Sequence, residues 1–498
     1  MLFNSLQFLI FLPIVMAVYY IIPKPVKHLW LLAASYYFYM CWNAVYALLM
    51  LLSTVLTYLC SLGLDAVGRR DLPAPRKLAL RKAVLWASLL INLGILFFFK
   101  YFDFAIDSLN ALLVHVGLHL NTPGFDVLLP VGISFYTFQA LGYTIDVYRG
   151  EIYAERDFFR YALFVSFFPQ LVAGPIERSK NLLSQLAVPH KFSYDNFREG
   201  LLLMLWGYFL KIVIADRLAL FVDTVYSADY QNFGGFVVII ATIFFAIQIY
   251  CDFGGYSSIA IGAAKMLGVN LMENFNTPYL ALSISDYWKR WHISLSTWFR
   301  DYVYIPLGGN KKGKARKYLN IMITFGASGL WHGANWTYVA WGLINGFYQV
   351  IGSILMPLRR CLVHSLGLNE NSVGHKALRM LFTFILILIS LVFFRASSLS
   401  MALEMLRSCI YLRPWSLFDG SLYLLGLNKP NFTLALFSIA LLLFADIMKY
   451  RGVCMRKLIM AQDSWCRVLV ISLSVSLILL FGIWGNAYDA ASFIYFQF

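Results

Sequence analysis

The chain alternates long apolar stretches with short polar loops from its beginning to its end. A helix needs about 20 mostly apolar residues to cross a bilayer, and the longer stretches reach that length. The pattern predicts about eleven or twelve transmembrane helices, with re-entrant and interfacial helices between them. We expect them in the ranges 5–22, 29–40, 44–63, 83–99, 101–120, 158–173, 198–226, 233–251, 318–328, 337–357, 380–394, 432–447 and 468–485, some of which are partial spans.

Basic residues gather in particular loops and set an orientation. The loop from Asp65 to Lys82 carries six Lys and Arg residues, and 311–317 and 449–457 are similarly basic. Cytoplasmic loops of membrane proteins carry an excess of Lys and Arg. A single orientation places all these loops in the cytoplasm and both termini outside, as in a multi-pass protein of a bacterial cytoplasmic (inner) membrane.

Four segments depart from the simple pattern. Residues 128–147 contain Pro and Gly, which predicts a broken or re-entrant helix lining a cavity. In 198–226, Lys and Asp interrupt the apolar run, so this segment bends or lies in the interface. Asp252, followed by two Gly residues, is expected to cap a broken helix. Residues 283–306 interleave charges with aromatic residues at three- and four-residue steps, which predicts one amphipathic helix.

Composition excludes a soluble enzyme carried on a single anchor. Of the 498 residues, 60% are hydrophobic and only 13% charged, about half the charged share of a soluble domain. A net charge of +15 would fit nucleic acid, but no nucleic-acid-binding motif is present, so we expect contact with anionic lipid instead. The seven Cys show no metal or disulfide spacing. Without repeats or linkers, 1–498 is predicted to be a single domain.

His332 is placed by this pattern at the tip of a buried helical hairpin. It lies fourteen residues after Tyr318 at the cytoplasmic edge, or roughly 21 Å into a core of about 30 Å. The next basic residues, Arg359 and Arg360, are again cytoplasmic, so the chain turns near 331–336 and returns. A His within a Trp belt is the alternative. Ionisable groups at membrane depth are costly and usually functional, which favours function.

Two blocks of sequence resemble the membrane-bound O-acyltransferase (MBOAT) family. One is DYWKRWHISLS (286–296) with WFRDY (298–302) and IPLGG (305–309), and the other is WHGANW (331–336). The stretches 131–139 and 174–178 resemble its bacterial branch of alginate and peptidoglycan O-acetylation membrane proteins, related to the teichoic-acid D-alanyl transfer protein. The resemblance covers 1–498 and implies an all-α ring of helices around a central tunnel, with a catalytic core at about 128–357.

Residue roles follow from this resemblance. It implies that His332 is the catalytic base and His292 the second motif residue, with Trp331, Trp336, Arg300 and Asp301 in substrate binding. A buried neutral imidazole suits removal of a hydroxyl proton. Asn335 is expected either to orient the imidazole or bind an oxyanion, or to bond its own backbone in a turn. His292 is equally expected to serve the donor side or to pair with Asp286 or Asp301.

The last residues, 486–498, are predicted to form an extracytoplasmic tail. They end in FIYFQF (493–498), which resembles the aromatic tail of this branch, and the resemblance implies that Tyr495 accepts the acyl group. An interfacial aromatic anchor is the alternative. Because teichoic-acid D-alanyl systems use a tail on a separate small protein, a tail on this chain favours acetyl as the acyl group.

The resemblance implies a function and its partners. An acyl group would pass from a cytoplasmic thioester, acetyl-coenzyme A or an acylated carrier protein, towards hydroxyls of a cell-surface polysaccharide. The expected partners are the lipid bilayer, an extracytoplasmic SGNH-type acyltransferase or esterase-like protein, the polysaccharide and a carrier protein. No bound cofactor, metal or nucleic acid is expected. A transporter or flippase for a lipid-linked sugar, or a non-catalytic scaffold, is the alternative.

Overall fold

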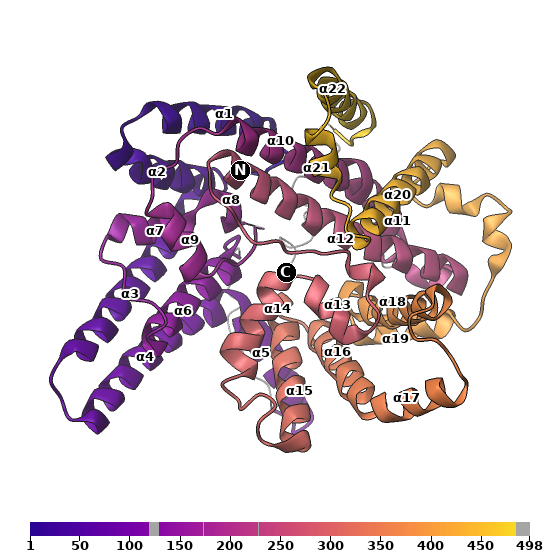
Figure 1. The fold of residues 1–498 in the computed structure, drawn as a ribbon. Helices are drawn as coiled ribbons and strands as arrows, with labels where there is room; N and C mark the ends of the chain where they lie inside the picture. The colour runs from indigo at the N-terminus through magenta and orange to yellow at the C-terminus, as the bar shows by residue number, and fades with distance from the viewer. Residues whose placement is uncertain (119–128, 173, 228, 485–498) are drawn as a thin grey trace. The chain divides into compact units, whose positions relative to one another are not determined.

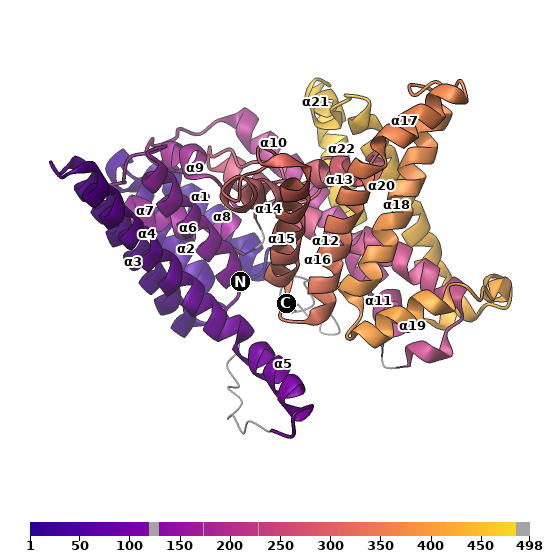
Figure 2. The ribbon, with the colours of Figure 1, turned by 90° about the horizontal axis from the view of Figure 1, so that it is seen from below.

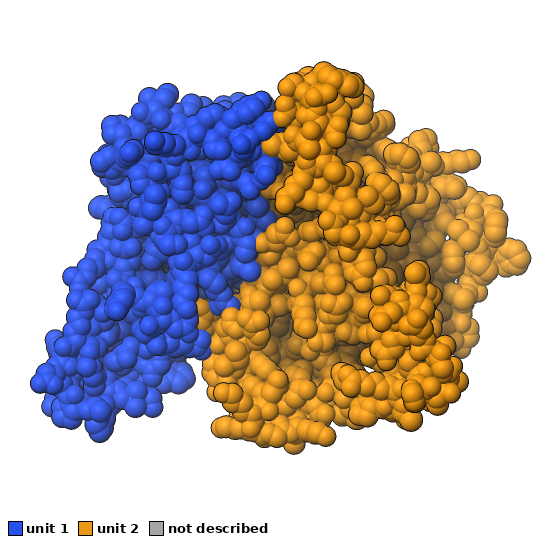
Figure 3. Space-filling model, in the orientation of Figure 1, with its two compact units in different colours: residues 1–201, 259–272 blue, residues 202–258, 273–498 orange. Residues whose placement is uncertain are grey.

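The computed structural model describes residues 1–118, 129–172, 174–227 and 229–484, and all the regular structure within these ranges is helical (Figure 1). Contacts divide the chain into two compact units, Met1–Leu201 with Ile259–Met272, and Leu202–Ser258 with Glu273–Phe498 (Figure 3). Helices α10 (Tyr194–Tyr208) and α12 (Gly235–Met266) contribute residues to both units. The single domain expected from the sequence stays a prediction.

Unit 1 is built mainly from the N-terminal helices. Polar side chains on one face of the long helix α3 join it to its neighbours: Ser53 Oγ donates to Asn92 Oδ1 of α4 at 2.6 Å, and the Tyr161 hydroxyl of α7 donates to Thr57 Oγ1 at 2.7 Å. Small polar residues allow close packing of membrane helices. The elements are α1 (Leu6–Ile21), η1 (Lys24–Val26), α2 (Lys27–Met40), α3 (Ala44–Arg69), α4 (Ala74–Leu96), η2 (Phe97–Tyr101), α5 (Phe102–Val114), α6 (Ile133–Arg149), α7 (Phe158–Ser166), α8 (Phe168–Leu171) and α9 (Ser179–Leu186).

Unit 2 has an aromatic core around α12. Phe221 of α11 contacts Phe244 of α12 at a ring-centroid distance of 5.3 Å, and Phe432 of α20 lies 5.5 Å from Phe244. Its remaining elements are η3 (Phe209–Ala215), α11 (Asp216–Val225), η4 (Tyr230–Asn232), η5 (Pro278–Leu280), α13 (Ile284–Arg290), α14 (Ile293–Phe299), η6 (Arg300–Tyr304), α15 (Gly313–His332), α16 (Trp336–Ile354), α17 (Met356–Ser365), α18 (Val373–Arg395), α19 (Leu399–Ser408), η7 (Pro414–Leu417), η8 (Ser421–Leu424), α20 (Lys429–Tyr450), α21 (Met455–Met460) and α22 (Ser464–Phe481).

Six helices in the described ranges are long and apolar enough to cross a membrane, or seven if the bent pair α16–α17 is one span. The chain is therefore a multi-pass membrane protein. The expected number was higher for identifiable reasons. The expected spans 83–99 and 101–120 belong to one helical run, Ala74–Val114. Segment 158–173 forms two helices of nine and four residues, and α1 has only 16 residues.

Two of the expected helix breaks are absent or differently placed, and one loop is shorter than expected. Helix α6 begins after Gly132, whose φ of 75° is left-handed, and continues unbroken past Gly142. Helix α12 runs straight through Asp252 and both following Gly residues. It does so because Asp252 has a cation: Lys211 Nζ lies 2.6 Å from Asp252 Oδ1 and 2.8 Å from Asp216 Oδ1, with all three side chains at most 4% exposed. The polar loop 65–82 is also shorter than expected, because α3 and α4 extend into it.

Candidate active site

Helices α15 and α16 form an antiparallel hairpin in unit 2 with His332 at its tip (Figures 1 and 2). Helix α15 ends at His332, and Asn335 begins α16 by accepting a hydrogen bond from the Thr337 backbone N–H at 3.0 Å. The two helices can approach closely because Gly329 has no Cβ. A Cβ at this position would lie only 2.3 Å from the Tyr338 carbonyl oxygen. The turn that the sequence predicts at 331–336 is confirmed.

Aromatic rings enclose the His332 side chain, which is 3% exposed. Its ring centroid lies 4.9 Å from Trp341, 5.0 Å from Trp331 and 5.4 Å from Phe394, with interplanar angles of 74–87°. We call these three rings the aromatic box. Trp341 comes from α16 and Phe394 from the end of α18. Such surroundings shield the imidazole from solvent.

Trp341 and Phe394 were not among the residues expected from the sequence. The buried face of α16 recurs at three- to four-residue steps through Thr337, Trp341 and Asn345, so helical periodicity starting from the WHGANW block could have found Trp341. No sequence pattern separates Phe394 from the adjacent Phe393, because its role depends on how α18 packs.

His292 lies at a break between two short helices, where one continuous amphipathic helix was expected. Helix α13 ends at Arg290 and α14 begins at Ile293. His292 between them has a left-handed φ of 42° and is fully buried. A residue other than Gly pays strain energy for this conformation, and such residues cluster at functional sites.

Trp331 brings the two His residues into one aromatic cluster. The Trp331 ring contacts His332, as above, and lies 6.1 Å from the His292 ring, which also contacts Phe253 at 4.6 Å. The structure thus places both predicted His residues against the same indole. Burial lowers the pKa of His292 to about 3, so its imidazole is neutral at physiological pH.

A buried polar chain fixes the backbone beside His292. The Ile293 N–H donates to the Asn274 carbonyl at 2.9 Å, and Ser294 Oγ donates to Asn274 Oδ1 at 2.7 Å. Asn274 Nδ2 donates in turn to Ser257 Oγ of α12 at 3.0 Å. Ser294 Oγ also lies 3.5 Å from His292 Nδ1. This chain ties the strained residue to the central helix α12.

The other predicted site residues occupy several positions. Asn335 Nδ2 donates to the Ser397 carbonyl at 3.2 Å, and with its helix cap these are the bonds of the turn residue that was one of its two interpretations. Arg300 pairs with Asp301 at 2.7 Å in η6. Trp336 is 54% exposed. Asp286, one possible His292 partner, accepts from Arg290 Nε at 2.9 Å. Tyr495 lies outside the described residues, so its role stays a prediction.

The chain was compared with known protein families and proteins, and the matching family model covers the site residues. The model of the membrane-bound O-acyltransferase family matches residues 154–394, which include both His residues and the aromatic box. The probable alginate O-acetylase of Pseudomonas putida is 36% identical over 509 residues, covering 100% of both chains. The chain belongs to the membrane-bound O-acyltransferase family. It is therefore an acyltransferase, which disfavours the transporter and scaffold alternatives.

Two further relatives of this acyltransferase carry other names. The peptidoglycan O-acetyltransferase of Helicobacter pylori is 34% identical over 450 residues, covering 84% of this chain and 81% of the relative. The teichoic acid D-alanyltransferase of Streptococcus thermophilus is 28% identical over 247 residues, covering 47% and 59%. The similarity to the O-acetylating relatives thus extends over much more of the chain than the similarity to the D-alanyl relative.

Proposed function

We propose that this membrane-bound O-acyltransferase moves an acetyl group from a cytoplasmic thioester across the membrane towards hydroxyl groups of a cell-surface polysaccharide, with His332 as the base. The observation that carries the proposal is a buried His at the tip of a helical hairpin, enclosed by aromatic rings in a chain that matches O-acetylating relatives over most of its length. The longer match to those relatives supports acetyl over D-alanyl.

The reaction needs one base and no cofactor. A hydroxyl oxygen attacks the thioester carbonyl carbon while the His332 imidazole takes the hydroxyl proton. The C–S bond then breaks, the thiolate leaves, and the imidazolium returns the proton to it. The thioester supplies the driving force. Acetyl-coenzyme A and an acetylated carrier protein both provide this chemistry, and the basic segment 311–317 would attract either one.

The first acceptor is the phenol of Tyr495 in this proposal. Its acetyl ester would then pass to an extracytoplasmic SGNH-type transferase that acylates the polysaccharide. A phenol beside a base is a reasonable nucleophile. The resemblance of the FIYFQF tail supports this step, with an anchoring role for the tail as its alternative.

The test is a labelling experiment on purified protein. Wild type, His332→Ala, Tyr495→Phe and His375→Ala are incubated with acetyl-coenzyme A radiolabelled in the acetyl group, and in a second series with an acetylated carrier protein. His375 is half-buried near the start of α18, outside both His blocks, and serves as the control. Covalent label is counted on the denatured protein.

Label on wild type and on His375→Ala, but on neither of the other two variants, is the expected result. Label that persists in Tyr495→Phe would reject the tyrosine ester and make the partner protein the direct acceptor. Label that persists in His332→Ala would reject His332 as the base. Absence of label with both donors would overturn transfer to this chain.

A further inference from the structure

A basic cavity in unit 1 lies apart in sequence from the two His blocks. It has a volume of about 270 Å³, which is room for several water molecules or a phosphate group. Its walls come from the ends of several elements: the end of α1, η1 and the start of α2, the start of α7, the end of α9 and the segment that follows it, and Val269.

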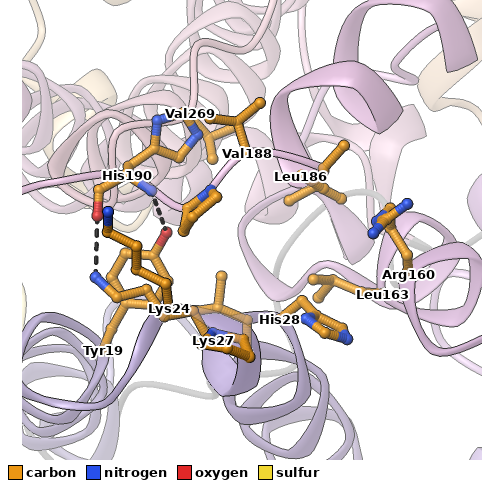
Figure 4. Close-up of a pocket in the computed structure, with 14 residues that line it drawn as sticks. Tyr19, Lys24, Lys27, His28, Arg160, Leu163, Leu186, Val188, His190 and Val269 are labelled. Atoms are coloured by element: carbon orange, nitrogen blue, oxygen red, sulfur yellow. Dashed lines mark hydrogen bonds between the residues drawn. The ribbon is translucent and has the colours of Figure 1, made fainter.

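The cavity is lined by three cations, Lys24, Lys27 and Arg160, by two His side chains, and by no carboxylate among its fourteen described lining residues. Lys24, Lys27 and His190 lie at one end beside Tyr19, Arg160 lies at the other, and His28 lies between them (Figure 4). Arg160 is balanced from outside the cavity by Glu155 at 3.3 Å and Asp157 at 3.5 Å. In the described part of the chain, neither Lys24 nor Lys27 has a carboxylate partner.

Lys27 is buried, and its ammonium group has N–H donors available for a ligand. Its side chain is 7% exposed, and its Nζ donates to the His190 carbonyl at 3.0 Å and lies 4.6 Å from the Tyr19 ring centroid. An ammonium carries three N–H donors, so this bond leaves two for a ligand. Lys27 also begins α2, whose positive dipole end adds to the field.

The pKa shifts of Lys27 and His190 agree with a positively charged cavity. The pKa of Lys27 is lowered by burial and then by the nearby Lys24. The pKa of His190 is lowered mainly by burial and also by Lys27. A buried charge without a counter-ion is costly, and an anion bound in the cavity would remove that cost.

We propose that this cavity is a binding site for a phosphate group, contributed by an anionic phospholipid whose headgroup contacts Lys24 and Lys27. Apolar surface at the same helix ends favours a lipid over a free phosphate: Ile21, Val26 and Val188 are 82%, 41% and 59% exposed, and Val188 also lines the cavity. Basic pockets among membrane helices recognise acidic headgroups in this way. Coenzyme A is the other source of the same chemistry. This inference is independent of the proposed function.

The test measures lipid binding to the full chain by native mass spectrometry. Phosphatidylglycerol, zwitterionic phosphatidylcholine and coenzyme A are titrated separately into wild type, Lys24→Gln, Lys27→Gln and the control Lys82→Gln. Lys82 is an exposed Lys of α4 in the same unit that does not line the cavity. Lys24 is exposed, so Lys24→Gln keeps the test valid even where Lys27→Gln folds poorly.

We expect phosphatidylglycerol to bind wild type more tightly than phosphatidylcholine does. We expect phosphatidylglycerol to bind Lys24→Gln about fivefold more weakly than it binds wild type. Lys82→Gln should bind like wild type. Equal binding to Lys24→Gln and Lys82→Gln would overturn the site. Loss of coenzyme A binding in Lys24→Gln, with phosphatidylglycerol binding unchanged, would overturn the lipid and assign the phosphate site to coenzyme A.

Discussion

The position of His332 depends on how closely α15 and α16 approach, and a single methyl group tests this dependence. Gly342 of α16 lies against α15, and a Cβ added there would be 2.3 Å from the Phe325 carbonyl oxygen and 3.0 Å from the Gly329 Cα. Both contacts are backbone, which cannot rotate away as a flexible side chain can. Gly342→Ala should therefore push the two helices apart.

The size of the effect follows from that distance. A Cβ essentially never lies closer than 3.0 Å to a non-bonded heavy atom, and 3.4 Å is ordinary contact, so α15 must move by roughly 0.7–1.1 Å. Phe325 is two helical turns before His332, so the shift carries to the imidazole. A misplacement of about 1 Å can cost about a hundredfold in rate, whereas overpacking costs about 1–3 kcal/mol in stability.

Two other glycines of α16 provide a graded control. A Cβ on Gly352 would meet nothing within 4 Å, so Gly352→Ala should leave activity unchanged and stabilise the helix by up to about 1 kcal/mol. A Cβ on Gly346 would lie 3.1 Å from Met322 Sδ, which can rotate away, and 3.1 Å from Phe325 Cβ, which is fixed by the backbone but need give only a few tenths of an ångström. Gly346→Ala should therefore have an intermediate effect.

The assay is the initial rate of acetyl transfer from labelled acetyl-coenzyme A, or from the acetylated carrier protein, by protein that elutes as a single species in detergent. A melting curve for each variant separates slow chemistry from loss of fold. Gly342→Ala with the activity of Gly352→Ala would refute the reasoning, because the crossing would then tolerate the methyl group. A folded Gly342→Ala with a much lower rate would support it.

Two further predictions concern buried charge. Lys211→Met removes the cation that two buried carboxylates share and should destabilise the protein by about 3–5 kcal/mol. Asp252→Asn keeps the Lys211–Asp216 pair and should cost only about 1–2 kcal/mol. Equal losses in detergent melting curves would contradict this account. His292 has its pKa lowered by burial to about 3, against about 6.5 when unfolded. Below pH 6.5 the unfolded chain takes up the proton and the folded chain does not, so stability should fall with pH by about 2 kcal/mol at pH 5. His292→Gln should flatten that part of the stability–pH curve, and an unchanged curve would show that His292 titrates normally.

Length and apolarity predicted the helical membrane class and most helix positions, and the basic loops on either side predicted the hairpin at 331–336. They failed where tertiary partners decide the outcome. Asp252 with two Gly residues looks like a helix break, yet Lys211 neutralises the carboxylate and one of the glycines, Gly255, lets α12 approach the Gly207 carbonyl, 2.7 Å from where a Cβ would be. No local pattern reveals a cation supplied from about forty residues away.

The site residues likewise fall into those that the sequence predicted and those that only the packing reveals. His332 was found because an ionisable group stands out among apolar neighbours, and His292 because its block resembles the family. Trp341 and Phe394 are ordinary apolar residues for a membrane helix, so only packing shows that they enclose an imidazole. The break at His292 was missed because a three- to four-residue stripe continues across it, and the left-handed φ is held by bonds to Asn274.

The aromatic box reconciles two opposed demands on His332 if it acts as the proposed base. Before reaction the imidazole must stay neutral, and exclusion of water by Trp331, Trp341 and Phe394 favours that form. After taking the proton it becomes a cation in a place with little water. A cation over an aromatic face is attracted by about 0.5–2 kcal/mol, and these three rings lie within 4.9–5.4 Å of the imidazole in near-perpendicular arrangements. The ring contacts favour the charged form in the resting state as well, but more weakly than a carboxylate would. They therefore offset part of the cost of the buried cation while the exclusion of water still favours the neutral base.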